Sequence, residues 1–569
     1  MQSEAFQQAP ATPIDETPRA GGPSALLALI AACSAVFLTA LDQTVVVTAL
    51  PSITSDLQIP LQQLDRAAWI ISAYLLGYVI AMPLMGRISD LYGRRLVFVI
   101  CLSIFGVASL FCGLATVLGD GVDITFLQHI GINVAAPGSI GDPSSLQPGL
   151  VWLVAARFVQ AAGGGAIIPV AMAVAGDYYG ERQRALALGL VGMVTETGGV
   201  LGPLYGAAIV QTFTWHMIFY LNVPLVIILI VFIVLLLKRR PADTPPARRA
   251  RRLDLPGTLL LGASLICLSL GLSQEAVIGT AVLTGTNNPA PIQNNPVLIA
   301  CAIALFLAFV GLEIFAERRV THAFGRTLPI VEPSLFRRRA FSASSLVSLL
   351  VGAALIIAMA DIPLFIATVQ NGSALDSGLA LLRLTVMIPL GAVIGGWLCS
   401  RLTCRLTALI GLLLAAAGFW LMHLWPIAVD LNQITTSTLI CGLGFGLVIA
   451  PISTTAINAV HNYQMGMGAS VVTVLRMIGM ILGLAALTSW GLGRFYDVVN
   501  SFKLPPGITP FSQAYATFEA HVATVAAHDV FTSIFLAAGV LCFVAILPAF
   551  LLEGRQASPY TVVRARTGA

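Results

Sequence analysis

The stretch that decides the fold is ALALGLVGMVTETGGVLGPLYGAAIV, residues 185–210. It is long and apolar enough to cross a bilayer, yet it carries an acid, Glu196, near its middle. An ionised carboxylate at the centre of a bilayer costs about 2.5 to 3.5 kcal/mol, so it calls for a partner or a function. The small residues that follow, with Pro203 among them, are typical of a helix that is closely packed and bent.

Composition extends this reading to the whole chain. It is 57% hydrophobic and 10% charged, with a mean hydropathy of +0.90, whereas soluble domains carry about 25% charged residues. Apolar spans of about 20 residues, the length that crosses about 30 Å of hydrocarbon, occur fourteen times. They lie at about 25–50, 67–85, 96–117, 150–174, 185–210, 216–237, 256–274, 297–316, 341–369, 377–400, 406–425, 435–456, 467–490 and 530–552. We therefore expect an all-α membrane protein with 14 transmembrane helices.

The distribution of basic residues predicts the orientation, because Lys and Arg in short loops stay on the cytoplasmic side. With the N-terminus inside, 24 of the 30 basic residues fall in cytoplasmic segments and three, Arg66, Arg494 and Lys503, fall outside. Both termini, 1–24 and 553–569, are then polar cytoplasmic tails, and the expected location of this multi-pass protein is the cytoplasmic (plasma) membrane. The net charge of +4 follows from this topology and does not indicate binding to nucleic acid.

Several classes of chemistry lack a signal. The two lysines do not follow glycine, so the phosphate-binding pattern GxxxxGK[ST] is absent. The nine cysteines are scattered, with no metal-ligand spacing and no disulfide framework. We expect no cofactor, no metal and no enzymatic activity, so energy for any transport would come from a gradient or a partner.

The loops divide the spans into six plus two plus six. Residues 25–237 form a predicted N-terminal six-helix bundle, and 341–552 form a C-terminal one. Residues 238–340 hold basic loops and two inserted linker helices. Two such halves are expected to surround a central site as repeats.

The loop between the second and third spans reads GRISDLYGRR, residues 86–95. Gly86 and Gly93 permit a tight turn, Asp90 is placed to cap or pair near a helix end, and Arg94 and Arg95 favour the cytoplasmic side. The loop resembles the signature G-x-x-x-D-x-x-G-R-R of the major facilitator superfamily. That resemblance implies the major facilitator fold.

Three further stretches narrow the resemblance. LDQTVVVTALPSI at 41–53 is similar to the first-span signature of the 14-helix drug:proton antiporter family. The stretch 157–165 resembles the arginine element of that family, with Ala161 where glycine is usual, and 198–207 resembles its antiporter motif through Gly198, Gly202, Pro203 and Gly206. The second half is degenerate, because GGWLCSRLTCR at 395–405 lacks the acid of the signature loop.

Six ionisable residues lie inside the spans of the two halves: Asp42, Glu196, Asp361, Arg157, Arg383 and Arg476. At about 3 kcal/mol each, they would cost roughly 20 kcal/mol if all faced lipid alone. We therefore expect them to face the bundle interior and to meet partners.

Depth along each helix, at about 1.5 Å per residue, places Glu196 and Arg476 near the midplane. They are a candidate pair between the halves. One interpretation is a structural ion pair. The other is a protonatable coupling site, since burial raises the pKa of a carboxylate and a nearby arginine lowers it, so a helix motion that separates the two would move a proton.

The other four charges fall nearer the outside. Asp361 and Arg383, on consecutive helices, are a candidate local pair. Asp42 and Arg157 share a depth, but depth alone does not show that they meet. The resemblance implies a proton-relay role for Arg157, and simple neutralisation of an acid is the alternative.

The region at about 491–529 differs from a simple loop. Apolar residues keep helical spacing on both sides of Leu504-Pro505-Pro506-Gly507, which predicts an outward helical hairpin. The alternative is an amphipathic segment on the lipid headgroups. This shape, combined with the buried residues Asp42, Glu196 and Arg476 and the strings Asp361-Ile362-Pro363-Leu364 and Leu381-Leu382-Arg383-Leu384, is similar to the subgroup of mycobacterial triacylglyceride exporters. These exporters work with a lipid-binding lipoprotein. The outer loop 118–149 is a candidate lid.

The sequence thus predicts a monomeric, proton-coupled secondary transporter that exports hydrophobic or amphipathic compounds by alternating access. The alternative is a lipid exporter that takes triacylglyceride-like molecules from membrane lipids to an extracytoplasmic lipoprotein. A non-transporting receptor or an enzyme is a remote third reading.

Overall fold

The computed structural model describes residues 23–57, 69–119, 147–237, 252–272, 296–321, 327–329, 331–372, 374–461, 464–501 and 513–552. Within these ranges the regular secondary structure is helical apart from one parallel pair of two-residue strands. Thirteen of the described helical stretches are long and apolar enough to cross a membrane. The protein is therefore a multi-pass membrane protein. The seventh expected span is the helix α12, whose apolar stretch is shorter, Pro256–Leu268.

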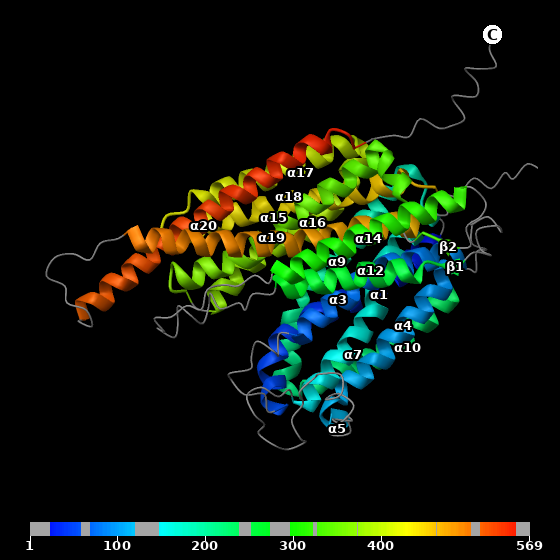
Figure 1. The fold of residues 1–569 in the computed structure, drawn as a ribbon, viewed down its shortest axis with the longest axis horizontal. Helices are drawn as coiled ribbons and strands as arrows, with labels where there is room; N and C mark the ends of the chain where they lie inside the picture. Colours follow the sequence, from blue (N-terminus) through cyan, green and yellow to red (C-terminus); the bar gives the residue numbers. More distant parts are fainter. Residues whose placement is uncertain are drawn as a thin grey trace, which may run out of the picture.

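The first part of the chain forms one bundle (Figure 1). Its helices are α1 (Pro23–Asp56), α3 (Trp69–Tyr92), α4 (Arg94–Gly113), α5 (Ala115–Gly119), α7 (Pro148–Gly165), α8 (Ile167–Tyr178), α9 (Glu181–Thr212) and α10 (His216–Leu236). α7 and α8 are two parts of one span, which runs from Pro148 to Tyr178. We call this bundle the N-half.

A linker follows and leads into a second bundle, the C-half. The linker contains β1 (Arg252–Leu253), α12 (Leu255–Leu272), α14 (Pro296–Thr321), β2 (Thr327–Leu328) and the 3-10 helix η2 (Pro333–Arg337). The C-half contains α15 (Arg339–Thr368), α16 (Ala374–Arg401), α17 (Cys404–His423), α18 (Leu431–Asn458), α19 (Met465–Ser501) and α20 (Gln513–Ala549). β1 pairs with β2 and so joins the beginning of the linker to its end.

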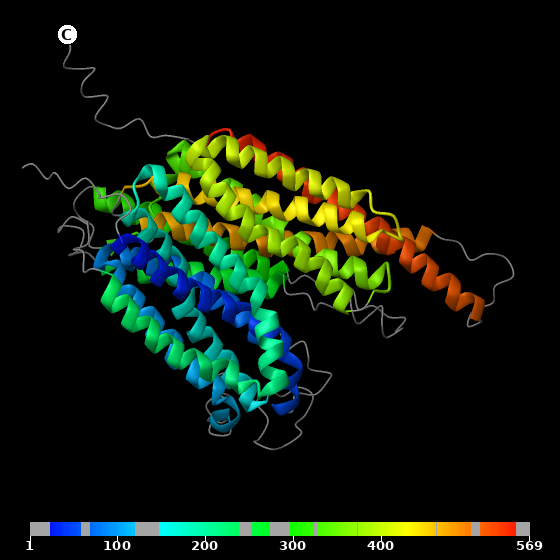
Figure 2. The same ribbon diagram turned by 180° about the vertical axis from the view of Figure 1, so that it is seen from behind.

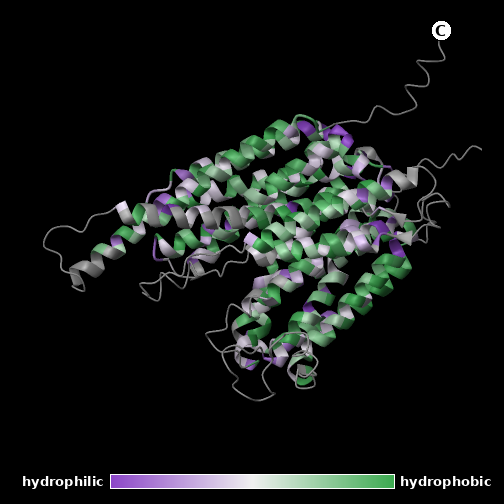
Figure 3. Ribbon diagram, in the orientation of Figure 1, coloured by the Kyte–Doolittle hydropathy of each residue, from purple (hydrophilic) through white to green (hydrophobic). Residues whose placement is uncertain are grey.

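The two halves are packed together at one end of the molecule and diverge toward the other, as both views show (Figures 1 and 2). The end where they meet carries residues 86–95 and the β1–β2 pair, and we call it the loop end. Hydrophobic residues predominate along the length of the helices, while hydrophilic residues are more frequent near their ends (Figure 3). This pattern suits a bundle whose sides face hydrocarbon.

The last two helices extend beyond their neighbours. α19 and α20 each have 37 residues, which corresponds to roughly 55 Å at 1.5 Å per residue, well beyond the hydrocarbon thickness. The first turns of α20 protrude at the end opposite the loop end (Figures 1 and 2). The expected breaker at 504–507 and most of the outer loop 118–149 lie outside the described residues.

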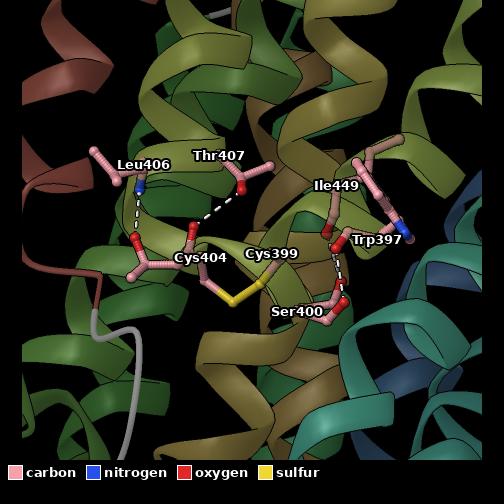
Figure 4. The surroundings of a disulfide bond; sticks show 9 residues. Trp397, Cys399, Ser400, Cys404, Leu406, Thr407 and Ile449 are labelled. Atoms are coloured by element: carbon pink, nitrogen blue, oxygen red, sulfur yellow. Dashed lines mark hydrogen bonds between the residues drawn. A yellow bond between two sulfur atoms is a disulfide. The ribbon is translucent and has the colours of Figure 1, made fainter.

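One expectation about the cysteines is wrong. Cys399 at the end of α16 and Cys404 at the start of α17 form a disulfide, with their Cα atoms 4.3 Å apart (Figure 4). Thr403 caps α17, because its hydroxyl accepts a hydrogen bond from the backbone N–H of Leu406 at 3.1 Å. The tight turn between the two helices brings the cysteines together, and a search for metal-ligand spacing does not detect such a pair.

Candidate functional site

Asp42 lies at the centre of a fully buried polar cluster in the N-half. Arg157 donates from Nη1 to its Oδ2 at 2.6 Å, and both side chains are 0% exposed. Gln160 and Asn222 donate to its Oδ1 at 3.2 and 2.7 Å. The guanidinium carbon of Arg157 also lies 4.0 Å from the ring centre of Tyr74, a cation–π contact. The acid thus has one charged and two neutral donors, so its charge is compensated without water.

The neutral members of this cluster are absent from the candidate residues of the sequence analysis. Gln160 and Asn222 also donate to the Ser109 hydroxyl, at 3.1 and 3.0 Å. Each of these residues is a single uncharged polar residue within an apolar span, and that pattern could have identified them. A search limited to ionisable residues does not detect it. Because α1, α4, α7 and α10 all contribute, the cluster joins helices of one half.

Glu196 and Arg476 form the second ion pair, and this one joins the halves. Arg476 Nη1 on α19 lies 2.9 Å from Glu196 Oε1 on α9. The side chains are 17% and 18% exposed, so water reaches them more readily than the Asp42 cluster. A bond between side chains of different halves breaks if the halves move apart at this level.

A small cavity adjoins the Glu196–Arg476 pair. Its walls come from α8 and α9 on one side and from α15, α18 and α19 on the other. Its volume is about 30 Å³, which is enough for about two water molecules and far too small for a drug or a lipid. Beside the pair, the polar lining consists of hydroxyl groups, from Thr195, Ser348, Ser453 and Thr473.

α9 lies against α1 along a stripe of glycines. A Cβ atom on Gly202 would lie 2.0 Å from Thr44 Oγ1, and one on Gly206 would lie 2.5 Å from Thr48 Oγ1. A Cβ on Gly198 would meet α1 at 2.7 Å. Each distance is shorter than van der Waals contact allows, so glycine at these positions permits the close approach of the two helices.

Pro203 sits within α9 without ending the helix. Because proline has no N–H, the carbonyl of Gly199 loses its usual helical donor. The Thr44 hydroxyl of α1 donates to that carbonyl at 3.0 Å, and the Thr48 hydroxyl donates to the carbonyl of Pro203 at 3.2 Å. Two threonines of α1 therefore satisfy the backbone of α9 around its proline.

The signature loop connects the halves at the loop end. Asp90 Oδ1 accepts from the backbone N–H of Gly466 and Oδ2 from that of Met467, both at 2.9 Å, and so caps the N-terminus of α19. Arg94 donates to Asp90 and, through Nε, to Asp177 at 3.2 Å. A carboxylate of the N-half thus holds the first turn of a C-half helix.

The remaining loop residues have more local roles. A Cβ on Gly86 would lie 2.6 Å from the carbonyl oxygen of Gly466, so α3 and α19 are in close contact there. Gly93 has a φ of 96°, which favours glycine over residues with a side chain. Arg95 is half-buried at the start of α4.

The expected pair of Asp361 and Arg383 does not form. Both residues are half-buried on consecutive helices, α15 and α16, yet no ion pair joins either to another residue in the described ranges. Depth along a helix fixes the height of a side chain but not the direction in which it points. Equal depth was therefore insufficient to predict contact.

Comparison with known protein families assigns the class of protein. A model of the Major Facilitator Superfamily matches residues 32–484, so the chain belongs to that family, as the motifs predicted, and is a transporter rather than an enzyme. Among its relatives, a triacylglyceride transporter of Mycobacterium tuberculosis is 33% identical over 544 residues, covering 93% of this chain and 95% of the relative.

Two other comparisons agree with this assignment. A triacylglyceride transporter of Mycolicibacterium hassiacum is 35% identical over 548 residues, covering 93% of this chain and 92% of the relative. The crystal structure of the human organic anion transporter MFSD10 aligns with a TM-score of 0.55 at 15% identity, covering 94% of this chain and all of that one. This last similarity concerns the fold.

Proposed function

We propose that this transporter exports neutral lipids of the triacylglyceride type across the bacterial cytoplasmic membrane in exchange for protons. The observation that carries the proposal is the Glu196–Arg476 ion pair, which joins the halves at 2.9 Å beside a cavity of water size. The lipid class follows from the relatives, which are named triacylglyceride transporters.

In this proposal Glu196 exchanges Arg476 for a proton. While the pair is intact, the arginine favours the ionised carboxylate. When α9 and α19 move apart, the carboxylate loses its counter-charge and takes up a proton from the side then open. Return of Arg476 releases the proton, so proton binding and release accompany each conformational cycle that moves lipid.

The protruding turns of α20 fit export to a carrier. A triacylglyceride is insoluble in water, so it needs an apolar path from the bilayer to an acceptor. Placed on the extracytoplasmic side, with both termini in the cytoplasm, these turns would bring a monomeric transporter into contact with a lipid-binding lipoprotein.

The test is lipid transfer from proteoliposomes under an imposed pH gradient. We expect the parent protein to move a labelled triacylglyceride with the gradient, and Glu196→Gln to reduce that movement at least tenfold. The matched control is Asp430→Asn, since Asp430 is exposed at the start of α18 and its change should matter less than twofold. Full gradient-driven transfer by Glu196→Gln would contradict the coupling role.

A second candidate is the export of amphipathic drugs, which the sequence motifs at 41–53 and 198–207 favour by their resemblance to drug antiporters. The same vesicles discriminate the two. Gradient-driven movement of a cationic dye without movement of triacylglyceride would support drug export and contradict the lipid assignment.

A further inference from the structure

The segment that connects the linker to the C-half places an acid between the two halves. Glu332 lies between β2 and η2 and is buried. Arg87 of α3 donates from Nη2 to its Oε1 at 2.8 Å, and Gln464, directly before α19, donates from Nε2 to its Oε2 at 2.5 Å. One carboxylate from the linker thus holds the N-half and the C-half together. We call this contact the Glu332 bridge.

The bridge depends on burial. Arg87 and Gln464 are both 1% exposed. An arginine stays protonated in proteins, so Arg87 needs a counter-charge wherever water is excluded. Removing the partner of a buried charge is strongly destabilising. The bridge therefore favours the arrangement in which the loop end is closed.

Neighbouring contacts hold Glu332 in position. Arg338, at the start of α15, donates to the backbone carbonyl of Ala459 at 2.5 Å. The backbone N–H of Ser334 donates to the Glu317 carboxylate of α14 at 3.1 Å. Because Arg338 directly follows η2 and joins this segment to α18, Glu332 is tied to the C-half and would be separated from Arg87 if the N-half moved away.

This arrangement differs from that of Asp90 nearby. Asp90 contacts the backbone of α19, but it also pairs with Arg94 of its own half. If the halves separate at the loop end, Asp90 keeps a counter-charge. Arg87 would lose its ion pair with Glu332, which comes from the linker. Of these two contacts, the Glu332 bridge is therefore the one in which opening separates an ion pair.

We propose that Glu332 is a positioning residue that sets how readily the two halves separate at the loop end. Through Glu332, the linker acts on the opening of this end of the protein. The inference rests on the alternating access of the proposed function, but it requires neither protons nor lipid. Its consequence is that loss of the Glu332 carboxylate shifts the protein toward states open at the loop end.

The test measures cysteine alkylation. Ser470 of α19 is fully buried at the contact with Gly86, so Ser470→Cys reports opening between α3 and α19. Native Cys441 is fully buried within the C-half and reports unfolding. Both rates are followed by mass spectrometry in detergent without substrate or gradient, so failure here is distinct from failure of proton coupling.

We expect Glu332→Gln to raise alkylation of Ser470→Cys about tenfold or more, which corresponds to about 1.4 kcal/mol, with Cys441 unchanged. Asp56→Asn, a control at the opposite end of the N-half, should change neither rate. The double variant Arg87→Met and Glu332→Gln should raise alkylation of Ser470→Cys by less than the two single effects combined. Both substitutions remove the same interaction, so their effects are not additive.

A milder variant covers the case in which Glu332→Gln fails to fold. Gln464→Leu removes only the neutral donor and should still raise alkylation of Ser470→Cys severalfold. The proposal is wrong if folded Glu332→Gln, or Gln464→Leu where the former does not fold, leaves that rate within twofold of the parent. It is also wrong if Ser470→Cys and Cys441 become reactive together, because that result indicates unfolding.

Discussion

Among the acids of the ion pairs described above, Asp42 is the one whose neutralisation, by Asp42→Asn, should destabilise the protein most. The replacement has nearly the same shape, so the packing around it is kept. It leaves Arg157 charged, 0% exposed and without a carboxylate, and arginine does not escape this by losing its proton. Breaking a buried pair from one side costs about 3–5 kcal/mol. The cation–π contact of Arg157 with Tyr74, 4.0 Å away, is present before and after the substitution and so does not replace the lost carboxylate.

Two other ion pairs provide an internal scale for this prediction. Glu196→Gln should cost about half as much or less, because that pair is 17% and 18% exposed and water screens the remaining arginine. Asp529→Asn, which breaks a pair with Arg494 that is 42% and 48% exposed, should cost less than about 1 kcal/mol.

The assay is reversible unfolding in mixed detergent micelles, with the free energy of unfolding measured for each variant. Asp42→Asn combined with Arg157→Gln should recover part of the loss, since it removes the uncompensated charge. A cost for Asp42→Asn no larger than that for Asp529→Asn would refute the reasoning, because it would mean that burial does not control the energy of these pairs.

Three further predictions concern packing, the loop end and the protruding helices. Gly202→Ala should impair lipid transfer at least tenfold, because its Cβ would lie 2.0 Å from Thr44 Oγ1. Gly199→Ala should be tolerated, because a Cβ at that position would have nothing within 4 Å. Lipid-transfer assays and thermal unfolding compare the two variants. Asp90→Asn should speed alkylation of Ser470→Cys, and an unchanged rate would argue against capping of α19. Deleting 495–525 should abolish transfer to a lipoprotein while gradient-driven dye movement, if present, persists; retained lipid transfer would exclude a role for the hairpin.

The sequence was sufficient for the class of fold because the signal is physical and repeated. Bilayer thickness sets the length of each apolar span, so the spans can be recognised in the sequence. An uncompensated charge in hydrocarbon is costly, so an acid within a span can be recognised as well. The family then followed from the loop at 86–95 and from the stripe at 198–206.

Contacts between particular residues were harder to foresee. Depth placed Glu196 level with Arg476, which do pair, but it also placed Asp361 level with Arg383, which do not. The direction in which a side chain points depends on the rotation and tilt of each helix, and packing determines both.

Glu332 was missed for a different reason. It lies in a polar connection, where an acid is ordinarily solvated, and only tertiary structure shows that Arg87 and Gln464 bury it. A search that considers only the charged residues within apolar spans therefore finds the acids inside the membrane. It overlooks acids such as Glu332 that become buried where the two halves meet.

The two intramembrane ion pairs are suited to different tasks because of where their partners come from. All donors to Asp42 belong to the N-half, so a movement of the halves as rigid bodies leaves that cluster intact. Glu196 and Arg476 belong to different halves, so the same movement breaks their bond and changes the charge environment of the carboxylate. Coupling of proton binding to alternating access requires a site that differs between the two states. On this argument we propose Glu196, rather than the more deeply buried Asp42, as the residue at which a proton is exchanged.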